Sequence, residues 1–192
     1  VQAARAAPGR IATLVLPADC AWDDAAGPAA PLPVAAPRRV DDAVIEQAAT
    51  ALRRGKPRLL LLRGDCLQRT GLDAAGRIAR ATGARLAQDY FTPRITRGAG
   101  LPPIERIPYF AEEIVSHLAG LEQIVLVGAP PPVTFFAYPG KPSWVTPPGC
   151  DLLTLATPQD DAVAALLALA DALGASESGA TVARVIPDLP PD

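Results

Sequence analysis

The sequence predicts an α/β fold, a doubly wound parallel sheet with helices on both faces, as in Rossmann-like nucleotide-binding domains. From Val40 onward, segments with helical spacing of apolar residues alternate with short strand-like segments, the order typical of parallel sheets. The strand-like segments are almost wholly apolar, as expected of strands buried on both faces. Glycines and prolines mark where most segments start or end.

The first 38 residues are predicted to be separate from the main domain. A short helix is expected at residues 2–7, then a Pro8-Gly9 turn and an apolar strand at 11–16. Residues 25–38 are rich in proline and alanine, which is typical of a linker. Because strand 11–16 has no sheet of its own, we expect it to pair with an exposed sheet edge or another chain, which predicts a dimer.

The main domain is expected to open with a helix that begins at Asp41 or Asp42 and stops at Gly55. Its inward face is predicted to consist of Val44, Ala48, Ala51 and Leu52. Strand 58–62 follows, then a helix at 72–82 that ends at Gly83, then a short strand at 84–87. The inward residues of that second helix are predicted to be Leu72, Ala75, Ile78 and Ala79.

A third helix is expected to run from Pro108 to Gly120, because proline fits the first turn of a helix. Its inward face is predicted to hold Phe110, Ile114 and Leu118. Strands 123–127 and 151–155 follow. The last helix is expected to have Thr157 as N-cap, Pro158 at its first position and Asp160 near the positive end of its dipole. Its buried face is predicted to hold Val163, Leu166, Leu167, Ala170 and Leu173.

Composition argues against several classes of protein. The 192 residues are 49% hydrophobic with a formal net charge of −2, so the chain can bury a core but lacks the basic surface that nucleic acid needs. No apolar run approaches the roughly 18 to 20 residues that span a bilayer. Cys20, Cys66 and Cys150 are odd in number and far apart, which predicts neither disulfides nor a zinc site and fits a reduced, cytoplasmic setting.

One stretch carries a family resemblance. The apolar run 124–128 leads into Ala-Pro-Pro-Pro-Val-Thr-Phe-Phe-Ala-Tyr-Pro-Gly-Lys-Pro-Ser-Trp. Residues 127–143 resemble the pattern Val-Gly-Ala-x-x-Pro-Val-x-Phe-Phe-Ala-Tyr-Pro-Gly-Lys-Pro-Ser, found in the middle domain of thiamine-diphosphate-dependent enzymes of the acetolactate synthase type. The resemblance extends to residues 9–19, 97–100 and 105–110, and so covers most of the chain.

The resemblance implies three successive α/β domains in the parent protein, of which this chain is the central one. Residues 1–38 would then be the end of the pyrimidine-binding domain plus a linker, 39–176 the central domain, and 177–192 a linker toward the diphosphate-binding domain. The parent would be a homo-oligomer that uses thiamine diphosphate and Mg²⁺ to decarboxylate a 2-oxo acid and transfer the resulting two-carbon unit. Its activating glutamate and Gly-Asp-Gly…Asn metal set would lie outside these residues, so no catalytic residue is expected here and the fragment alone should be inert.

Candidate ligand-binding residues follow from the predicted topology, because the crevice of an open parallel sheet lies outside the carboxyl ends of its strands. Gly64 and Gly128 match positions where flavin-binding relatives bring backbone close to the nucleotide. Arg94 and Arg97 could meet a diphosphate, but a surface turn is the favoured interpretation of residues 97–100. The candidate cofactor-binding residues are Gly64, Asp65, Arg94, Arg97, Gly128 and Ala129.

Departures from the flavin-binding pattern argue against FAD or ADP in this crevice. Asp65 would repel a pyrophosphate, and prolines 130–132 remove backbone N–H donors. The acidic pair that relatives often carry at the last strand is missing, since this sequence reads Leu153-Thr154-Leu155-Ala156 there. A stand-alone nucleotide-binding module and a ligand-free structural or oligomerisation domain remain the two alternatives to the parent-enzyme interpretation.

Two further features bear on function. His117 is the sole histidine and is expected at the surface or boundary of the third helix, with no partners for a metal site or triad. The loop 130–144 gathers Phe135, Phe136, Tyr138 and Trp144. Such a loop is either folded onto its own domain or forms a wall against a neighbouring domain or subunit near the substrate channel; the sequence leaves both interpretations open.

Overall fold

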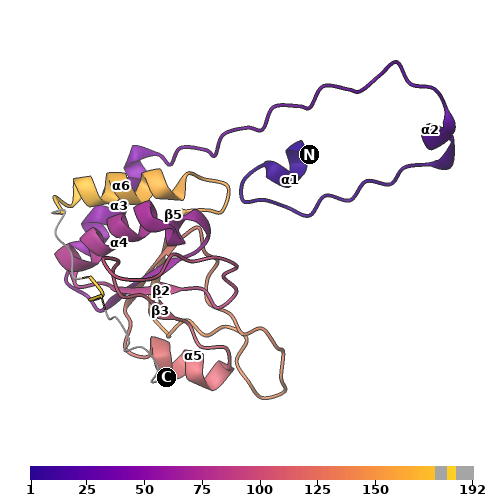
Figure 1. The fold of residues 1–192 in the computed structure, drawn as a ribbon. Coiled ribbons are helices and arrows are strands. Elements are labelled where there is room, and N and C mark those ends of the chain that lie inside the picture. The colour runs from indigo at the N-terminus through magenta and orange to yellow at the C-terminus, as the bar shows by residue number, and fades with distance from the viewer. Residues whose placement is uncertain (176–180, 185–192) are drawn as a thin grey trace, which may run out of the picture.

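An all-parallel five-stranded sheet organises the chain, seen in a computed structural model that describes residues 1–175 and 181–184 (Figure 1). The strand order is β3-β2-β1-β4-β5. The strands are β1 (Arg58–Leu62), β2 (Arg85–Gln88), β3 (Glu105–Arg106), β4 (Gln123–Val127) and β5 (Asp151–Ala156). The predicted α/β fold class is confirmed, and β1 and β4 have the predicted bounds.

Helices cover both faces of the sheet. Helices α3 (Asp42–Leu52), α4 (Arg69–Thr82) and α6 (Ala162–Ala172) lie together on one face, and α5 (Ala111–Leu118) lies on the other (Figure 1). A short 3-10 helix, η1 (Gly64–Leu67), joins β1 to α4. Helix α4 ends as predicted at Gly83, which has the left-handed φ of 71° that glycine adopts without strain.

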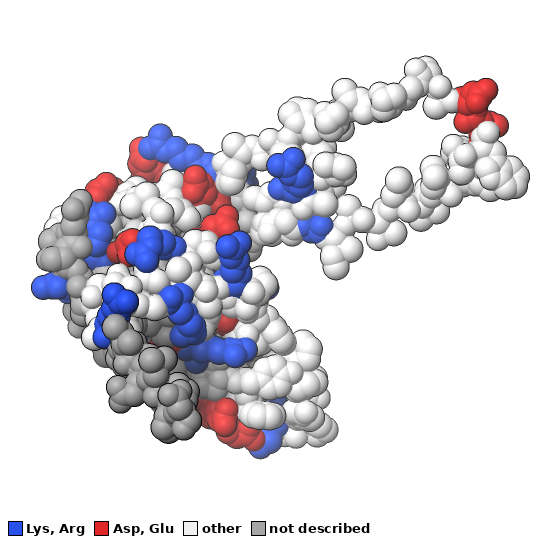
Figure 2. Space-filling view, in the orientation of Figure 1, with Lys and Arg blue, Asp and Glu red and all other residues white. Residues whose placement is uncertain are grey.

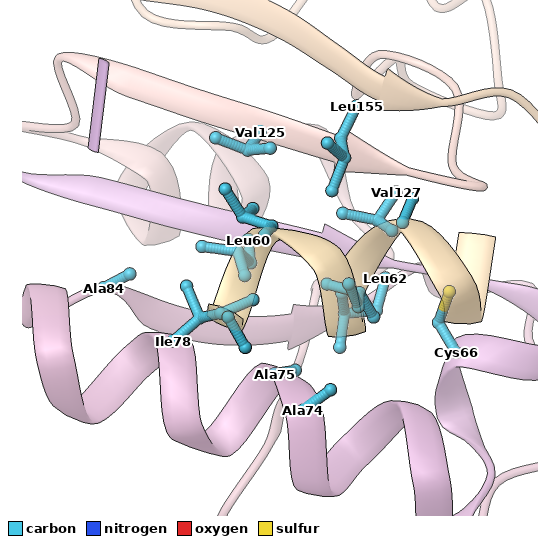
Figure 3. Packing of buried hydrophobic residues seen from close by; sticks show 14 of the residues in the cluster. Leu60, Leu62, Cys66, Ala74, Ala75, Ile78, Ala84, Val125, Val127 and Leu155 are labelled. Atoms are coloured by element: carbon cyan, nitrogen blue, oxygen red, sulfur yellow. The ribbon is translucent and has the colours of Figure 1, made fainter. Parts of the chain in front are cut away.

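The two central strands divide their side chains between two cores. Leu60, Leu62, Val125 and Val127 face α3, α4 and α6, where they pack with residues such as Ile78 and Leu155 (Figure 3). Leu59, Leu61, Ile124 and Leu126 face α5, against Ile114 and Leu118. All residues of β1 and β4 are buried, as expected of parallel strands with helices on both sides.

The predicted strand 11–16 does not pair with this chain's own sheet, and its pairing with a second copy stays a prediction. These residues carry no strand pairing and are exposed, with Ile11 at 98% and Leu14 at 85% exposure. The first 37 residues run away from the sheet and return, with short helices α1 (Gln2–Arg5) and α2 (Ala18–Trp22) along the way (Figure 1). A strand is defined by its partner, and within the described residues none pairs with this segment. The domain boundary at residue 38 stays a prediction.

Three helix starts also differ from prediction, and the first is that of α4, which begins at Arg69 and not at Leu72. Helix α5 begins at Ala111, not Pro108, and Phe110 is its exposed N-cap residue. Helix α6 begins at Ala162, because the Asp160 carboxylate accepts hydrogen bonds from Thr157 N at 2.7 Å and Oγ1 at 2.5 Å, which holds 157–160 in a turn. Asp161 is the N-cap instead of Thr157, and its Oδ1 accepts from Ala164 N at 2.9 Å.

The inward helix faces are shifted slightly from those predicted, and one strand was missed. In α3 the buried residues are Ile45, Ala48, Ala49 and Leu52, and in α6 they are Ala165, Leu166, Leu169 and Ala170. Ala79 of α4 is only half-buried. Strand β3 has two residues and no apolar pattern to predict it. The predicted linker 177–192 lies outside the described residues except for 181–184, where Val182 exchanges two backbone hydrogen bonds with Gly100 and Leu101.

The two N-cap positions allow a direct test of this geometry. Asp161→Ala removes a carboxylate that accepts a helix N–H, so we expect a loss of about 1 kcal/mol in the free energy of unfolding. Asp41→Ala is the matched control, because Asp41 is the N-cap of α3 but its side chain accepts no capping hydrogen bond. Urea unfolding of both variants is the measurement; equal losses would contradict the assigned cap.

A three-residue polar cluster ties β2, β3 and α5 together. Arg85 donates to Glu105 Oε1 at 3.2 Å and Oε2 at 2.5 Å, and His117 Nε2 lies 3.2 Å from both Arg85 Nη2 and Glu105 Oε2. Burial and the Arg85 charge lower the pKa of His117, and Glu105 opposes them. A hydrogen bond from Arg85 lowers the pKa of Glu105.

This cluster predicts a pH dependence of stability. Because the folded pKa of His117 lies below its unfolded value of about 6.5, its contribution is fully present above that pH and is lost as pH falls through the folded pKa. We expect His117→Gln, measured by urea unfolding between about pH 7.5 and 5, to flatten the decline in stability. His117 is the sole histidine, so unchanged pH profiles would contradict its assignment.

Candidate functional site

A crevice of ≈ 720 Å³ lies at the carboxyl ends of the central strands. The strand order reverses between β1 and β4, which is where ligands bind in open α/β sheets. Arg63, Gly64 and Asp65 line it from the end of β1, and Gly128 from the end of β4. The turn 157–163 before and at the start of α6 forms another wall, and Arg5, Pro8 and Pro37 of the N-terminal segment approach it.

Position 128 requires glycine because the backbone of Arg63 passes close to its Cα. It has a φ of 67°, and a Cβ built there would lie 3.0 Å from the carbonyl oxygen of Arg63. Its N–H donates to Ala156 O at 2.8 Å, while Arg63 N donates to Val127 O at 3.1 Å. These bonds continue the sheet into the crevice. Gly64 also has a positive φ, of 68°, but open space around its Cβ position.

The charged groups of the crevice are largely engaged with one another. Arg63 Nη1 lies 3.1 Å from Asp89 Oδ2, and Arg38 Nη2 lies 2.9 Å from Asp160 Oδ1. Burial opposes ionisation of Asp160, but hydrogen bonds from Thr157 and the charge of Arg38 outweigh it and lower the pKa of this carboxyl. Asp161 caps α6 at the same place.

This electrostatic arrangement does not suit a diphosphate. The start of α6 would attract an anion, but the carboxylate of Asp161 already fills that role. Asp65 and Asp160 add negative charge to the lining, and Arg63 is held by Asp89. Figure 2 shows basic and acidic side chains interspersed over the face in view, with no large region of one sign.

The structure brings together part of the predicted candidate set. Gly64, Asp65 and Gly128 line the crevice. Ala129 is buried in the core on the α5 face, and Arg94 and Arg97 are exposed and lie outside the crevice lining. Their role in ligand binding stays a prediction. Sequence reasoning pointed to the loops that begin at Arg63 and Ala156, but it did not select Arg63 or the turn 157–161 as candidate residues.

Nucleophilic and metal-binding groups are sparse in the part of the chain that the structure describes. Burial, with smaller contributions from Asp65 and Asp161, raises the pKa of the Cys66 thiol to about 12, which keeps it inert beside the crevice. Residues 1–175 and 181–184 contain no group of three or more histidine, cysteine, aspartate or glutamate side chains able to hold a metal ion. In the same residues no helix has the length and apolarity to cross a membrane.

A second surface lies beside the crevice and is aromatic. Tyr90 and Phe91 follow β2, Tyr109 and Phe110 precede α5, and the loop after β4 adds three more rings. Neighbouring rings lie 4.7 to 6.2 Å apart between centroids, mostly edge to face. We define the aromatic face as the six exposed members of this group: Phe91, Tyr109, Phe110, Phe135, Phe136 and Tyr138.

Fold and crevice define the class: an open-sheet α/β domain with a ligand-type crevice at its switch point. No family model matches the chain. It is 44% identical over 181 residues to the "Putative acetolactate synthase large subunit IlvX" of Mycobacterium tuberculosis. That match covers 94% of this chain but 35% of the relative, so the chain spans about a third of the relative's length. The resemblance to thiamine-diphosphate-dependent enzymes of the acetolactate synthase type is confirmed.

Solved structures described as thiamine-diphosphate-dependent enzymes share the fold. The "putative thiamin diphosphate-dependent enzyme isolated from Mycobacterium smegmatis" has a TM-score of 0.66 at 23% identity, over 96% of this chain and 38% of that one. The 4-hydroxybenzoylformate decarboxylase of Rhodococcus jostii has a TM-score of 0.59 at 15% identity, over 84% and 33%. Both likenesses concern the fold, and both again cover about a third of the larger protein.

The close approach at Gly128 is testable. We expect Gly128→Ala and the control Gly149→Ala each to lose roughly 1–2 kcal/mol of stability from a left-handed backbone. Gly128→Ala should lose about 1 kcal/mol more, because its Cβ presses on the Arg63 carbonyl while Gly149 has open space. Urea unfolding measures the stability of both variants. If Gly149→Ala lost as much stability as Gly128→Ala, the contact between the added Cβ and the Arg63 carbonyl would not be the cause.

Proposed function

We propose that this chain is the central α/β domain of a longer thiamine-diphosphate-dependent enzyme of the acetolactate synthase type. One observation carries the proposal: the identity of 44% extends over 94% of the chain, yet over 35% of the relative. In this arrangement the flanking catalytic domains are parts of the same polypeptide. The domain's role is to hold them at a fixed separation in a cytoplasmic homo-oligomer.

The parent enzyme's proposed reaction is decarboxylation of a 2-oxo acid and transfer of the two-carbon unit to an acceptor, as a transferase. Thiamine diphosphate, bound through Mg²⁺, supplies the carbanion chemistry when present. The residues of this chain do not fit that cofactor: it has no Gly-Asp-Gly sequence, and the crevice presents Asp65 and Asp160. The domain therefore contributes rigidity and orientation, and no group that touches the reacting atoms.

A nucleotide-binding module is the second candidate, favoured by the position of the ≈ 720 Å³ crevice at the switch point and by Gly64 and Gly128. The carboxylates of the lining weigh against it. Saturable binding of ADP, FAD or a coenzyme A derivative by the 192-residue chain, seen as a rise in Tm with ligand concentration, would favour this alternative.

The native polypeptide provides the test. We expect an intact mass of roughly three times 19.9 kDa, the ratio set by a match that covers 35% of the relative. The purified protein should then carboligate 2-oxo acids when thiamine diphosphate and Mg²⁺ are supplied, whereas the 192-residue chain should not. A native mass near 19.9 kDa would overturn the proposal and leave a free-standing binding or structural domain.

A further inference from the structure

The aromatic face is unusually exposed for so many rings. Its six side chains are between 36% and 56% exposed. Aromatic side chains bury 150–250 Å² each when fully packed, so the face leaves on the order of 500 Å² of ring surface in contact with water. That is the size of the largest apolar patch on a typical monomer, which is often functional, and of the apolar centre of an interface with about 800 Å² per partner.

The face is held rigidly by its own domain. Tyr90 Oη donates a hydrogen bond to Val133 O at 2.7 Å, and Thr134 N donates to Ser143 O at 2.9 Å. Val133 and Trp144 form an antiparallel bridge that closes the base of the loop. A surface already fixed in one conformation loses little conformational freedom when a partner covers it. The loop that carries these rings is thus packed against its own domain, and the exposed side of the rings is free to contact a partner.

The charges at the face are neutralised locally. A shallow pocket of ≈ 300 Å³ lies among the rings, and the two charged side chains in its lining, Glu112 and Lys141, form an ion pair with each other. The nearby Arg106 Nη2 donates to Tyr90 O at 2.8 Å. Arg106 keeps its positive charge, but the two charges in the pocket lining cancel, so a partner that covers the pocket would meet an apolar surface, which favours an apolar, uncharged counterpart.

We propose that the aromatic face is the seat of a neighbouring domain of the same enzyme, which covers it with an apolar, uncharged surface. The inference rests on the proposed function, in which this chain is one domain of three. The sequence match covers 35% of the relative, so the greater part of such a protein must pack outside this domain. The face adjoins the carboxyl-end crevice, because Asp89, which pairs with Arg63 there, directly precedes Tyr90.

Hydroxyl-radical footprinting of the native polypeptide and of the 192-residue chain tests the contact. We expect several-fold lower modification of Phe110, Phe135 and Phe136 in the longer polypeptide. A longer polypeptide whose rings are as reactive as in the short chain would overturn this inference and leave the proposed function intact. Concentration-dependent protection in the short chain, with a dimer in sedimentation, would overturn it in favour of a second copy. A native mass near 19.9 kDa would overturn both the proposed function and the proposed contact at the aromatic face.

Matched variants separate contact from folding. Phe135→Ser should lower the Tm of the longer polypeptide more than that of the 192-residue chain, because only the longer one buries the ring against a neighbour. Trp144→Ser is the control: Trp144 lies in the same loop with the same 54% exposure as Phe135 but outside the aromatic face. Its effect should be equal in the two contexts. Equal effects of Phe135→Ser in both contexts would also overturn the inference.

Discussion

Burial of β1 and β4 on both faces is the constraint on which the rest of this domain depends. Their side chains alternate, so that Leu60 and Val125 enter one core and Leu59 and Ile124 the other. Each face must be covered to remove its leucines and valines from water, at roughly 25 cal/mol per Å² of apolar surface. Parallel strands also need crossover connections, and two of these, between β1 and β2 and between β3 and β4, supply the covering helices α4 and α5. Two-sided burial therefore determines the layering, and the layering determines where the strand order reverses.

The position of the crevice follows from this topology, but the ligand that the crevice can bind depends on the side chains that line it. Any sheet of this order leaves a hollow beyond the ends of β1 and β4, because the chain departs in opposite directions from these two strands. What the hollow binds depends on a few side chains. Here Asp161 caps α6, and the guanidinium of Arg63 is held by Asp89. The groups that would attract a diphosphate are thus used to stabilise the domain, which is the distribution expected of a scaffold.

Sequence reasoning located the parts of the fold that depend on local pattern. Strands 58–62 and 123–127 are continuous apolar runs, and Gly83 ends α4 through its own backbone preference, so these were predictable. Sequence reasoning failed where the structure of a segment depends on a competing side-chain hydrogen bond or on contacts with residues far away in the sequence. The proline at 158 signals a helix start, but the Asp160 carboxylate holds a turn there first. Segment 11–16 has the composition of a strand but pairs with no strand among residues 1–175 and 181–184 of its own chain. The aromatic face depends on three segments that converge only after folding.

The energetics of the domain separate its core from its exposed apolar surfaces. The two cores are built from the sheet and its helices, and neither includes segment 11–16 or the six rings of the aromatic face. Those surfaces lie outside both cores, and they expose aliphatic and aromatic groups that an isolated protein would gain solubility by replacing. A fold whose two cores lie between the sheet and its helices, and which still exposes the aliphatic residues of segment 11–16 and the six rings of the aromatic face, has the surface expected of a domain with neighbours.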